Sequence, residues 1–358
     1  MRLLILLLLA PFFLFTQQKY ALTGSVVEKG SMAIPGASVF IEGTTMGTLA
    51  DANGLYMLKN IPAGRHRLVA SLVGYVPKMV FIEVPGKFIV YNFTLEEDNK
   101  TLAEVRVVGS QDKTWEKQFR AFERGFIGES YDRKEVYITN REVVDFTENK
   151  EVFTAAASQP LLIINKSLGY KITYYMYNFE RTNSLNSFKG LASFQELVPE
   201  DARQERRWNR NRVEAYEGSI KHFLKTLVGN RLEEEGFNAF LLKPEYLNNL
   251  RRGLFFDRNN ERHVAFKELD LIGVVSEEGL TTMNWKIPME IVFNRKRVAR
   301  PIFTDAPYPY TILIPKGLIQ VTAAGDLMNP YSIEMRGEMG KIGMADLLPL
   351  DFEINTEK

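Results

Sequence analysis

The sequence predicts a mainly β chain, with a seven-stranded-type β-sandwich at its N-terminal end and an α+β region after it. Three observations lead to this fold class. Short alternating strands separated by Gly, Pro and Asn turns fill residues 20–109. Two helical stretches with one apolar face follow at 114–126 and 201–229, and further alternating strands surround them. Closely spaced short strands indicate a sandwich, and strands mixed with a few helices indicate an α+β unit.

Residues 1–18 are predicted to form a cleaved export signal. Met1-Arg2 gives a short basic start, and an apolar run of about 13 residues extends from Leu3 to Phe15. A helix needs roughly 20 apolar residues to cross a bilayer, so this run favours a signal over an uncleaved anchor. Since no later window reaches spanning length without charge, we expect no transmembrane span after signal cleavage.

The composition argues against several kinds of chemistry. The chain has no cysteine, which excludes disulfides, thiolate metal sites and cysteine nucleophiles. Its formal net charge is +1, so no global charge draws it to nucleic acid or anionic lipid. The histidines His66, His222 and His263 lie far apart, without the spacing of a zinc motif. We therefore expect no metal, no cofactor and no nucleic-acid partner.

No catalytic motif can be assigned in the sequence. Ser219 and His222 lie three residues apart, but within a predicted helix rather than on the exposed turn that a serine nucleophile needs. Gly340-Lys341 lacks the other residues of a phosphate loop, and no dinucleotide-binding glycine motif is present. We expect a protein that is not an enzyme. Paired carboxylates leave no local signature, so a secreted hydrolase with its active site in the C-terminal region is an alternative.

The N-terminal strands are expected around one tight turn. Asp51-Ala52-Asn53-Gly54 suits a hairpin, because Asn and Gly tolerate positive φ and Asp can accept hydrogen bonds from nearby amides. A calcium site at Asp51 and Asn53 is rejected, since no downstream Glu completes the loop. The predicted strands are 22–27, 37–42, 44–50, 55–59, 67–73 and 88–95, with one more at 102–108.

Residues 20–109 resemble a known family through a series of spaced motifs. These are Gly24-x-Val26, Pro35-Gly36-Ala37-x-Val39, Gly43-Thr44, Gly47-Thr48, Asp51-x-x-Gly54, Ile61-Pro62-x-Gly64 and Gly74-Tyr75. The pattern is that of the carboxypeptidase-like regulatory domain, a transthyretin-like β-sandwich. The resemblance implies no catalytic residues, because such domains accompany enzymes and receptors without supplying them.

The same resemblance implies a cellular setting. Such domains are common in exported proteins of Bacteroidetes-type bacteria, often at the start of a TonB-dependent receptor. We do not expect the receptor itself, because fewer than 260 residues follow the domain and they contain no barrel-length series of amphipathic strands. The related fold of carbohydrate-binding modules makes a glycan site an analogy only.

The α+β region, residues 112–358, begins with a helix and a tyrosine-rich strand. Trp115, Phe119, Phe122 and Phe126 recur on one face of the helix, as expected for a core contact. The strand at 170–177 is apolar or aromatic on both faces. It is interpreted as a covered central strand, or alternatively as a glycan-binding face formed by Tyr174, Tyr175 and Tyr177.

The second helical stretch, 201–229, holds the one local basic patch. Its core-facing stripe closes at Gly229, and five arginines surround Trp208 near its beginning. An Arg–Trp cluster can hold a phosphate, a carboxylated glycan or an acidic loop, and we name Trp208, Arg207 and Arg210 as candidate binding residues. The alternative is a solvated helix whose arginines pair with neighbouring acids.

The rest of the region is predicted as strands, with two subdomains that meet near 200–235. The region resembles an uncharacterised segment that accompanies this sandwich in many Bacteroidetes-type exported proteins. The shared pieces are Trp115-x-x-x-Phe119-x-x-Phe122, Leu168-Gly169-Tyr170, Tyr216-Glu217-Gly218-Ser219 with His222-Phe223, and Leu348-Pro349-Leu350-Asp351. This second resemblance implies a domain layout and no activity.

Together these expectations describe an exported, non-enzymatic envelope protein that acts as a binding or assembly module. Its partner would be an unidentified envelope protein or glycan, and its location the periplasm, outer membrane or cell surface of a Gram-negative bacterium. A carbohydrate-binding protein is the first alternative and the secreted hydrolase is the second.

Overall fold

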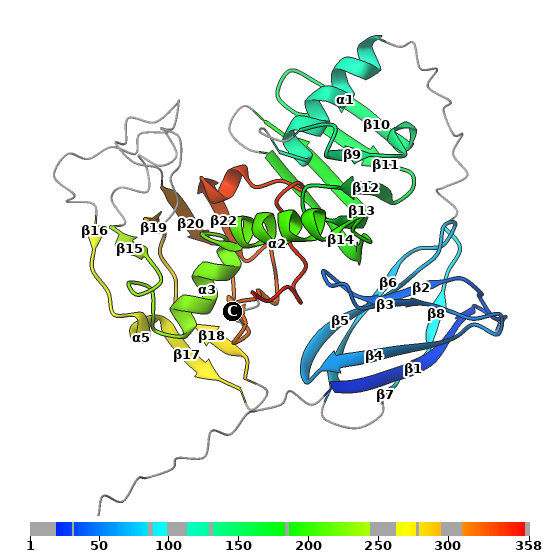
Figure 1. Cartoon of the computed structure of the whole chain (residues 1–358), viewed down its shortest axis with the longest axis horizontal. Coiled ribbons are helices and arrows are strands. Elements are labelled where there is room, and N and C mark those ends of the chain that lie inside the picture. Colours follow the sequence, from blue (N-terminus) through cyan, green and yellow to red (C-terminus); the bar gives the residue numbers. More distant parts are fainter. Residues whose placement is uncertain are drawn as a thin grey trace, which may run out of the picture.

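The computed structural model describes residues 19–354, apart from 31, 85–88, 99–112, 129–131, 183–185, 244–262, 277–278 and 295–309. The export signal expected at 1–18 and the strand expected at 102–108 lie outside these residues. The described chain is mostly β, as predicted, and Figure 1 shows it as a sandwich, a sheet beneath α1, and a further β part around α3. No helix among the described residues is long and apolar enough to span a membrane.

The sandwich consists of two packed sheets. One contains β4 (Leu55–Pro62), β1 (Lys19–Glu28), β7 (Ile89–Val90) and β8 (Phe93–Leu95). The other contains β3 (Gly47–Leu49), β2 (Ser38–Ile41), β5 (Gly64–Ser71) and β6 (Lys78–Val84). Strands β7 and β8 pair with β1 one after the other, both in parallel, so they are two parts of one interrupted strand. Within its described residues the sandwich therefore has seven strand paths.

The turn at Asp51 connects the two sheets of the sandwich. Asp51 Oδ1 accepts hydrogen bonds from the amides of Asn53 at 2.8 Å and Leu55 at 2.9 Å. Gly54 has φ +73°, and a Cβ there would lie 2.6 Å from the carbonyl oxygen of Val26. The predicted turn chemistry is present, but the predicted hairpin is wrong. Because β3 and β4 belong to different sheets, this turn carries the chain across the sandwich.

A six-stranded antiparallel sheet follows, with β13 at its centre. Strand β13 pairs with β14 along nearly its whole length, and with β12 and β11 on its other side. Helix α1 (Lys113–Phe126) covers one face, and its buried Phe119, Phe122 and Phe126 pack into the core as predicted. The strands are β9 (Val136–Ile138), β10 (Val144–Glu148), β11 (Phe153–Ala157), β12 (Leu161–Asn165), β13 (Tyr170–Arg181) and β14 (Asn186–Glu196), with a 3₁₀ turn at Arg141–Val143.

The single helix expected over 201–229 is two helices, α2 (Ala202–Tyr216) and α3 (Ile220–Val228). The break lies at Gly218, which has φ +73° and whose Cβ would approach Phe293 Cδ1 to 2.7 Å. Ser219 then caps α3, because its Oγ accepts a hydrogen bond from the amide of His222 at 3.2 Å. Placing Ser219 in mid-helix was therefore wrong, and its hydroxyl has a capping role.

The last part of the described chain packs its core around α3. Phe223, Leu224 and Leu227 of this helix are fully buried there among apolar strand residues. One sheet has the order β16-β15-β19-β20-β22 and a smaller one the order β17-β18-β21. The elements are β15 (Phe237–Leu242), β16 (His263–Val264), α5 (Glu268–Leu271), β17 (Ile272–Val275), β18 (Thr281–Met283), β19 (Met289–Phe293), β20 (Thr311–Pro315), β21 (Gln320–Val321), β22 (Ile333–Gly337) and a 3₁₀ turn at Met339–Lys341.

Candidate functional site

The sandwich joins the rest of the chain through the turn between β2 and β3. The amide of Gly43 donates to the carbonyl of Ala192 at 2.7 Å, and the amide of Phe194 donates to the carbonyl of Thr44 at 3.0 Å. Both partners lie on β14, which within the described residues pairs with β13 alone and so forms an edge of its sheet. The turn therefore hydrogen-bonds to this edge as a short extra strand would.

The C-terminal segment holds the same turn from its other side. The amide of Leu350 donates to the carbonyl of Gly43 at 2.7 Å. The carboxylate of Asp351 accepts hydrogen bonds from the amide of Thr45 at 3.0 and 3.1 Å, and from its hydroxyl. Gly43 has φ +76°, a backbone conformation that favours glycine, and a Cβ there would lie 2.8 Å from Leu350 Cδ1. Two motifs separated by 306 positions in the chain thus meet.

Helix α3 fixes the C-terminal segment in turn. Lys221 Nζ donates to the carbonyl of Leu350 and forms an ion pair with Asp326 Oδ1 at 2.9 Å. The ring of Phe352 lies 6.2 Å from that of Tyr216, centroid to centroid. The C-terminal segment, red in Figure 1, thus runs between the helices and the sandwich. We call this meeting place the junction; it is formed by residues 40–46, 65–69, 175, 191–194, 322–328 and 350–352.

A buried apolar contact completes the junction. Phe40 stacks on Tyr175 with ring centroids 5.7 Å apart and an interplanar angle of 15°. Val69 and Leu191 join them in one buried cluster, so the outer face of a sandwich sheet packs against β13 and β14. Burial raises the pKa of Tyr175, although a hydrogen bond with Ser71 acts against it. Tyr175 is thus a contact residue between two parts of the chain.

An ion pair lies beside this cluster, largely removed from water. The carboxylate of Glu42 is bound by the guanidinium of Arg67, and Glu42 is only 8% exposed. Burial raises the pKa of Glu42, whereas Arg67 and the backbone of Ala192 act to lower it. A buried pair of this kind costs desolvation energy, and removing either partner would leave an unpaired charge.

A cavity of about 130 Å³ opens at the junction. Its lining includes the apolar side chains Ile41, Met46, Leu327, Met328 and Leu350 and the polar or charged side chains Glu42, Arg65, His66, Arg67, Asp326 and Asp351. Each of its three carboxylates already has a partner: Arg67 for Glu42, Lys221 for Asp326 and Thr45 for Asp351. Among the described residues, no group of three His, Asp or Glu is placed to hold a metal ion.

The structure changes the picture of the predicted Arg–Trp patch. Trp208 is 4% exposed, and its Nε1 donates to the carbonyl of Lys166 at 2.6 Å. Arg207 lies 3.4 Å from both Glu135 Oε2 and the same carbonyl. Arg210 is exposed. The expectation that Trp208 offers an exposed contact is therefore corrected: its apolar ring is packed beneath the helix, and the charged residues around it stay at the surface.

The three tyrosines of the predicted glycan face are not together. Tyr174 is 5% exposed and belongs to the core, Tyr175 lies in the junction, and Tyr177 is 59% exposed. The sequence did not single out Tyr331, which is 41% exposed. The pKa of Tyr177 is raised mainly by burial and, to a smaller extent, by the neighbouring phenol of Tyr331. The hydroxyl of Tyr331 accepts from the amide of Gly190 at 3.1 Å.

Comparison with known proteins identifies the N-terminal part. Residues 22–107 match the family model of the CarboxypepD_reg-like domain. The TonB-dependent receptor P39 of Formosa agariphila is 36% identical over 88 residues, which are 24% of this chain and 8% of the receptor. The chain therefore spans less than a tenth of the length of that relative.

Similar solved structures include a cohesin–X-dockerin complex of Acetivibrio cellulolyticus, at 18% identity over 22% of this chain and 58% of that one, with a TM-score of 0.20. A putative carbohydrate-binding protein of Bacteroides uniformis is 12% identical over 44% of this chain and 60% of its own, with a TM-score of 0.19. These scores are too low to support an argument about function. From the match to the family model, the chain carries at residues 22–107 the CarboxypepD_reg-like domain that its motifs indicated.

Proposed function

We propose that this protein is an exported envelope protein that acts as a binding or assembly module, with the junction as its recognition site. The observation that carries the proposal is the double attachment of the turn at 43–45, to β14 on one side and to Leu350-Asp351 on the other. This attachment gives the sandwich one fixed orientation. A fixed orientation lowers the entropy that is lost when a partner binds across both parts.

The carboxylates that line the cavity are bound by other residues of the chain, which also supports binding rather than catalysis. A general acid or base must reach the substrate proton. Glu42, Asp326 and Asp351 are instead occupied by Arg67, Lys221 and Thr45. The lining also contains the apolar side chains of Met46, Leu327 and Met328, which suit a protruding apolar side chain of a partner.

Photo-crosslinking in intact cells tests the proposal. A photo-reactive phenylalanine analogue is placed at Arg65 or Met328, which line the cavity, and at the remote, exposed Glu148 of β10 as the control. Both cavity positions are expected to give the same one or two adducts, and the control position none of them. Absence of adducts at Arg65 and Met328, or identical adducts at Glu148, would contradict the junction as a recognition site.

Carbohydrate binding is the second candidate, and the exposed Tyr177 and Tyr331 favour it. The ammonium group of Lys189 lies 5.2 Å from the centroid of the Tyr331 ring. Tyrosines with one ring face open and polar groups nearby suit the alternating apolar and hydroxyl surfaces of a sugar.

Titration with cello-, xylo- and manno-oligosaccharides checks this candidate. If one of them binds, Tyr177→Ala and Tyr331→Ala should each weaken it about tenfold, since losing a central aromatic contact costs more than about 1 kcal/mol. Phe81→Ala is the control, because Phe81 is an aromatic residue of the sandwich that is 49% exposed. An equal loss in the control, or no binding of any of these sugars by the intact protein, would rule out a sugar site for them at Tyr177 and Tyr331.

A further inference from the structure

Helix α2 is fixed to the turn between β12 and β13 by polar contacts along one of its faces. Trp208 Nε1 donates to the carbonyl of Lys166 at 2.6 Å, and Asn211 Nδ2 donates to that of Ser167 at 2.9 Å. Arg212 Nε donates to the carbonyl of Leu168 at 2.7 Å. The helix buries only Trp208 and Tyr216 of its 15 residues. It is therefore held rigidly while adding little to the core.

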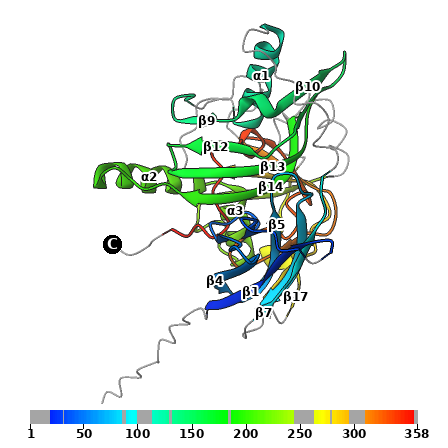
Figure 2. The same ribbon diagram turned by 90° about the vertical axis from the view of Figure 1, so that its right-hand side faces the viewer.

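The opposite face of α2 presents a row of arginines. Arg203, Arg206 and Arg210 are exposed and, with roughly 3.6 residues per turn, lie within about 60° of one another around the helix axis. The two other arginines of α2 form ion pairs within the chain, Arg207 with Glu135 and Arg212 with Glu196. Figure 2 shows α2 projecting at the left edge of the molecule. We call these three residues the arginine row.

The charge and spacing of the arginine row indicate which kind of partner surface can bind it. Helix α2 has five arginines and two glutamates, a net charge of +3, although the whole chain is almost neutral. A rise of about 1.5 Å per residue places the three arginines about 4.5 and 6 Å apart along the axis. A partner helix whose carboxylates recur every third or fourth residue has the same spacing, and guanidinium groups bind carboxylates through two parallel hydrogen bonds.

We propose that the arginine row binds an acidic helical segment of a partner protein, with carboxylates at every third or fourth position of one face. The proposal goes beyond the junction and depends on the proposed function only in requiring a protein partner. Because α2 is anchored, little backbone conformational freedom is lost on binding. Each exposed pair contributes about 0.2–1 kcal/mol, so the row sets register and specificity more than it sets affinity.

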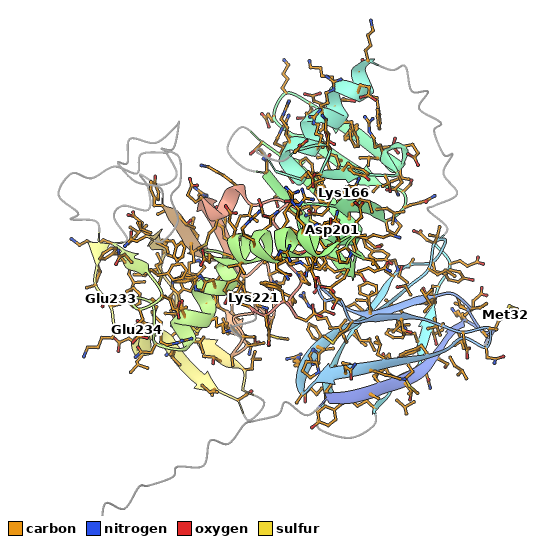
Figure 3. All side chains as sticks on the ribbon, in the orientation of Figure 1. Met32, Lys166, Asp201, Lys221, Glu233 and Glu234 are labelled. Carbon is orange, nitrogen blue, oxygen red and sulfur yellow. The ribbon has the colours of Figure 1, made fainter. Side chains whose placement is uncertain are left out.

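A protein partner fits this surface better than an anionic membrane does. Glu200 and Asp201 lie at the beginning of α2, and Glu205 lies within its first turns, all of them exposed. Figure 3 shows Asp201 beside the helix. A uniformly anionic lipid surface would bring phosphates against these carboxylates as well as against the arginines. A peptide can place its carboxylates opposite the arginines alone.

Fluorescence anisotropy with two labelled peptides tests the proposal on the full mature chain. Both peptides are helical and have the same composition. One carries Glu at i, i+3, i+7 and i+10, and the other has its Glu residues distributed around the helix. The first should bind more tightly, and R203A/R206A/R210A should weaken it about tenfold, as expected for the loss of three exposed pairs. Binding should also weaken as salt is raised.

A matched control comes from α1, where Lys113, Lys117 and Arg120 are exposed at nearly the same spacing. K113A/K117A/R120A should leave the affinity within about twofold. A charge exchange provides a further test: R203E/R206E/R210E should bind a peptide with Lys in place of Glu. All three variants alter exposed side chains, so their unfolding curves should match that of the unchanged protein.

Two results would overturn the proposal. One is equal binding of the two peptides, or equal loss in the α1 control, which would show unspecific charge attraction. The other is arginine-dependent binding to phosphatidylglycerol vesicles without a preference between the peptides, which would assign the row to a membrane. Crosslinking from Arg65 and Met328 is read independently, so failure of the arginine row and failure of the junction are distinguishable.

Discussion

Replacing Trp208 with alanine should lower the free energy of unfolding by about 3–5 kcal/mol, as expected for truncation of a large buried aromatic side chain. The ring lies against Gly169, where a Cβ would approach Trp208 Cδ2 to 2.4 Å. Gly169 has φ +73°, so the turn before β13 and the tryptophan ring depend on each other. The substitution also leaves the carbonyl of Lys166 without its 2.6 Å hydrogen bond from the indole.

Urea unfolding measures this loss. Arg203→Ala on the exposed face of the same helix is the control and should change the free energy by no more than about 0.5 kcal/mol. Trp208→Phe retains much of the ring volume but not the donor, so it should lie between the two. A Trp208→Ala protein as stable as the Arg203→Ala protein would show that the packing against Gly169 contributes little.

Replacing Arg67 with alanine should cost about 3–5 kcal/mol near neutral pH, because it leaves the buried carboxylate of Glu42 without its counter-charge. Glu42 is 8% exposed, and the side chain of Arg67 is 14% exposed. In the unchanged protein burial already raises the pKa of Glu42, and Arg67 is among the groups that lower it. Without Arg67 the pKa of Glu42 should rise further.

The pH dependence of this loss has a definite sign. A carboxyl group whose pKa is higher in the folded than in the unfolded chain binds more protons when folded. Its contribution to stability therefore falls as pH rises from the ordinary value of 4.5 through the raised value in the folded chain. The deficit of Arg67→Ala should be largest at neutral pH and should shrink as the pH falls and Glu42 becomes protonated.

Unfolding curves over a pH series provide the measurement. The double substitution Arg67→Ala with Glu42→Gln serves as the control, because it removes the titrating group and should recover part of the loss at neutral pH. A deficit in Arg67→Ala that does not vary with pH would show that Glu42 is not the cause.

The sandwich was predictable because its signals are local. Asp51 and Gly54 determine a turn through their own hydrogen bonds and backbone geometry, whatever lies elsewhere in the chain. The pairing across that turn was misjudged, since a turn motif does not tell whether the following strand joins the same sheet. The strand β6 (Lys78–Val84) was not predicted. The core face of α1 was equally readable, because Phe119, Phe122 and Phe126 repeat at the helical period.

The errors concern residues whose role depends on distant partners. The apolar period continues across Gly218, so the sequence indicates one helix, whereas packing against Phe293 requires the break. Trp208 stands among arginines, which suggests exposure, but its ring packs against Gly169 in the turn before β13, about 40 positions earlier in the chain. The Thr45–Asp351 contact spans 306 positions, and neither residue carries a local sign of it. The residues of the junction can therefore be read from a single sequence, but the contacts between them cannot be predicted from it.

The position of the 43–44 turn on β14 has a consequence for the solubility of the protein. An edge strand offers unpaired amide and carbonyl groups to other molecules and is a starting point for aggregation. Here Gly43 and Thr44 occupy the groups of Ala192 and Phe194, and the hydroxyl of Tyr331 contacts Gly190 on the same strand. The sandwich is therefore also a cover for the neighbouring sheet. A chain that lost this domain would expose a long, well-ordered strand to association with its own copies.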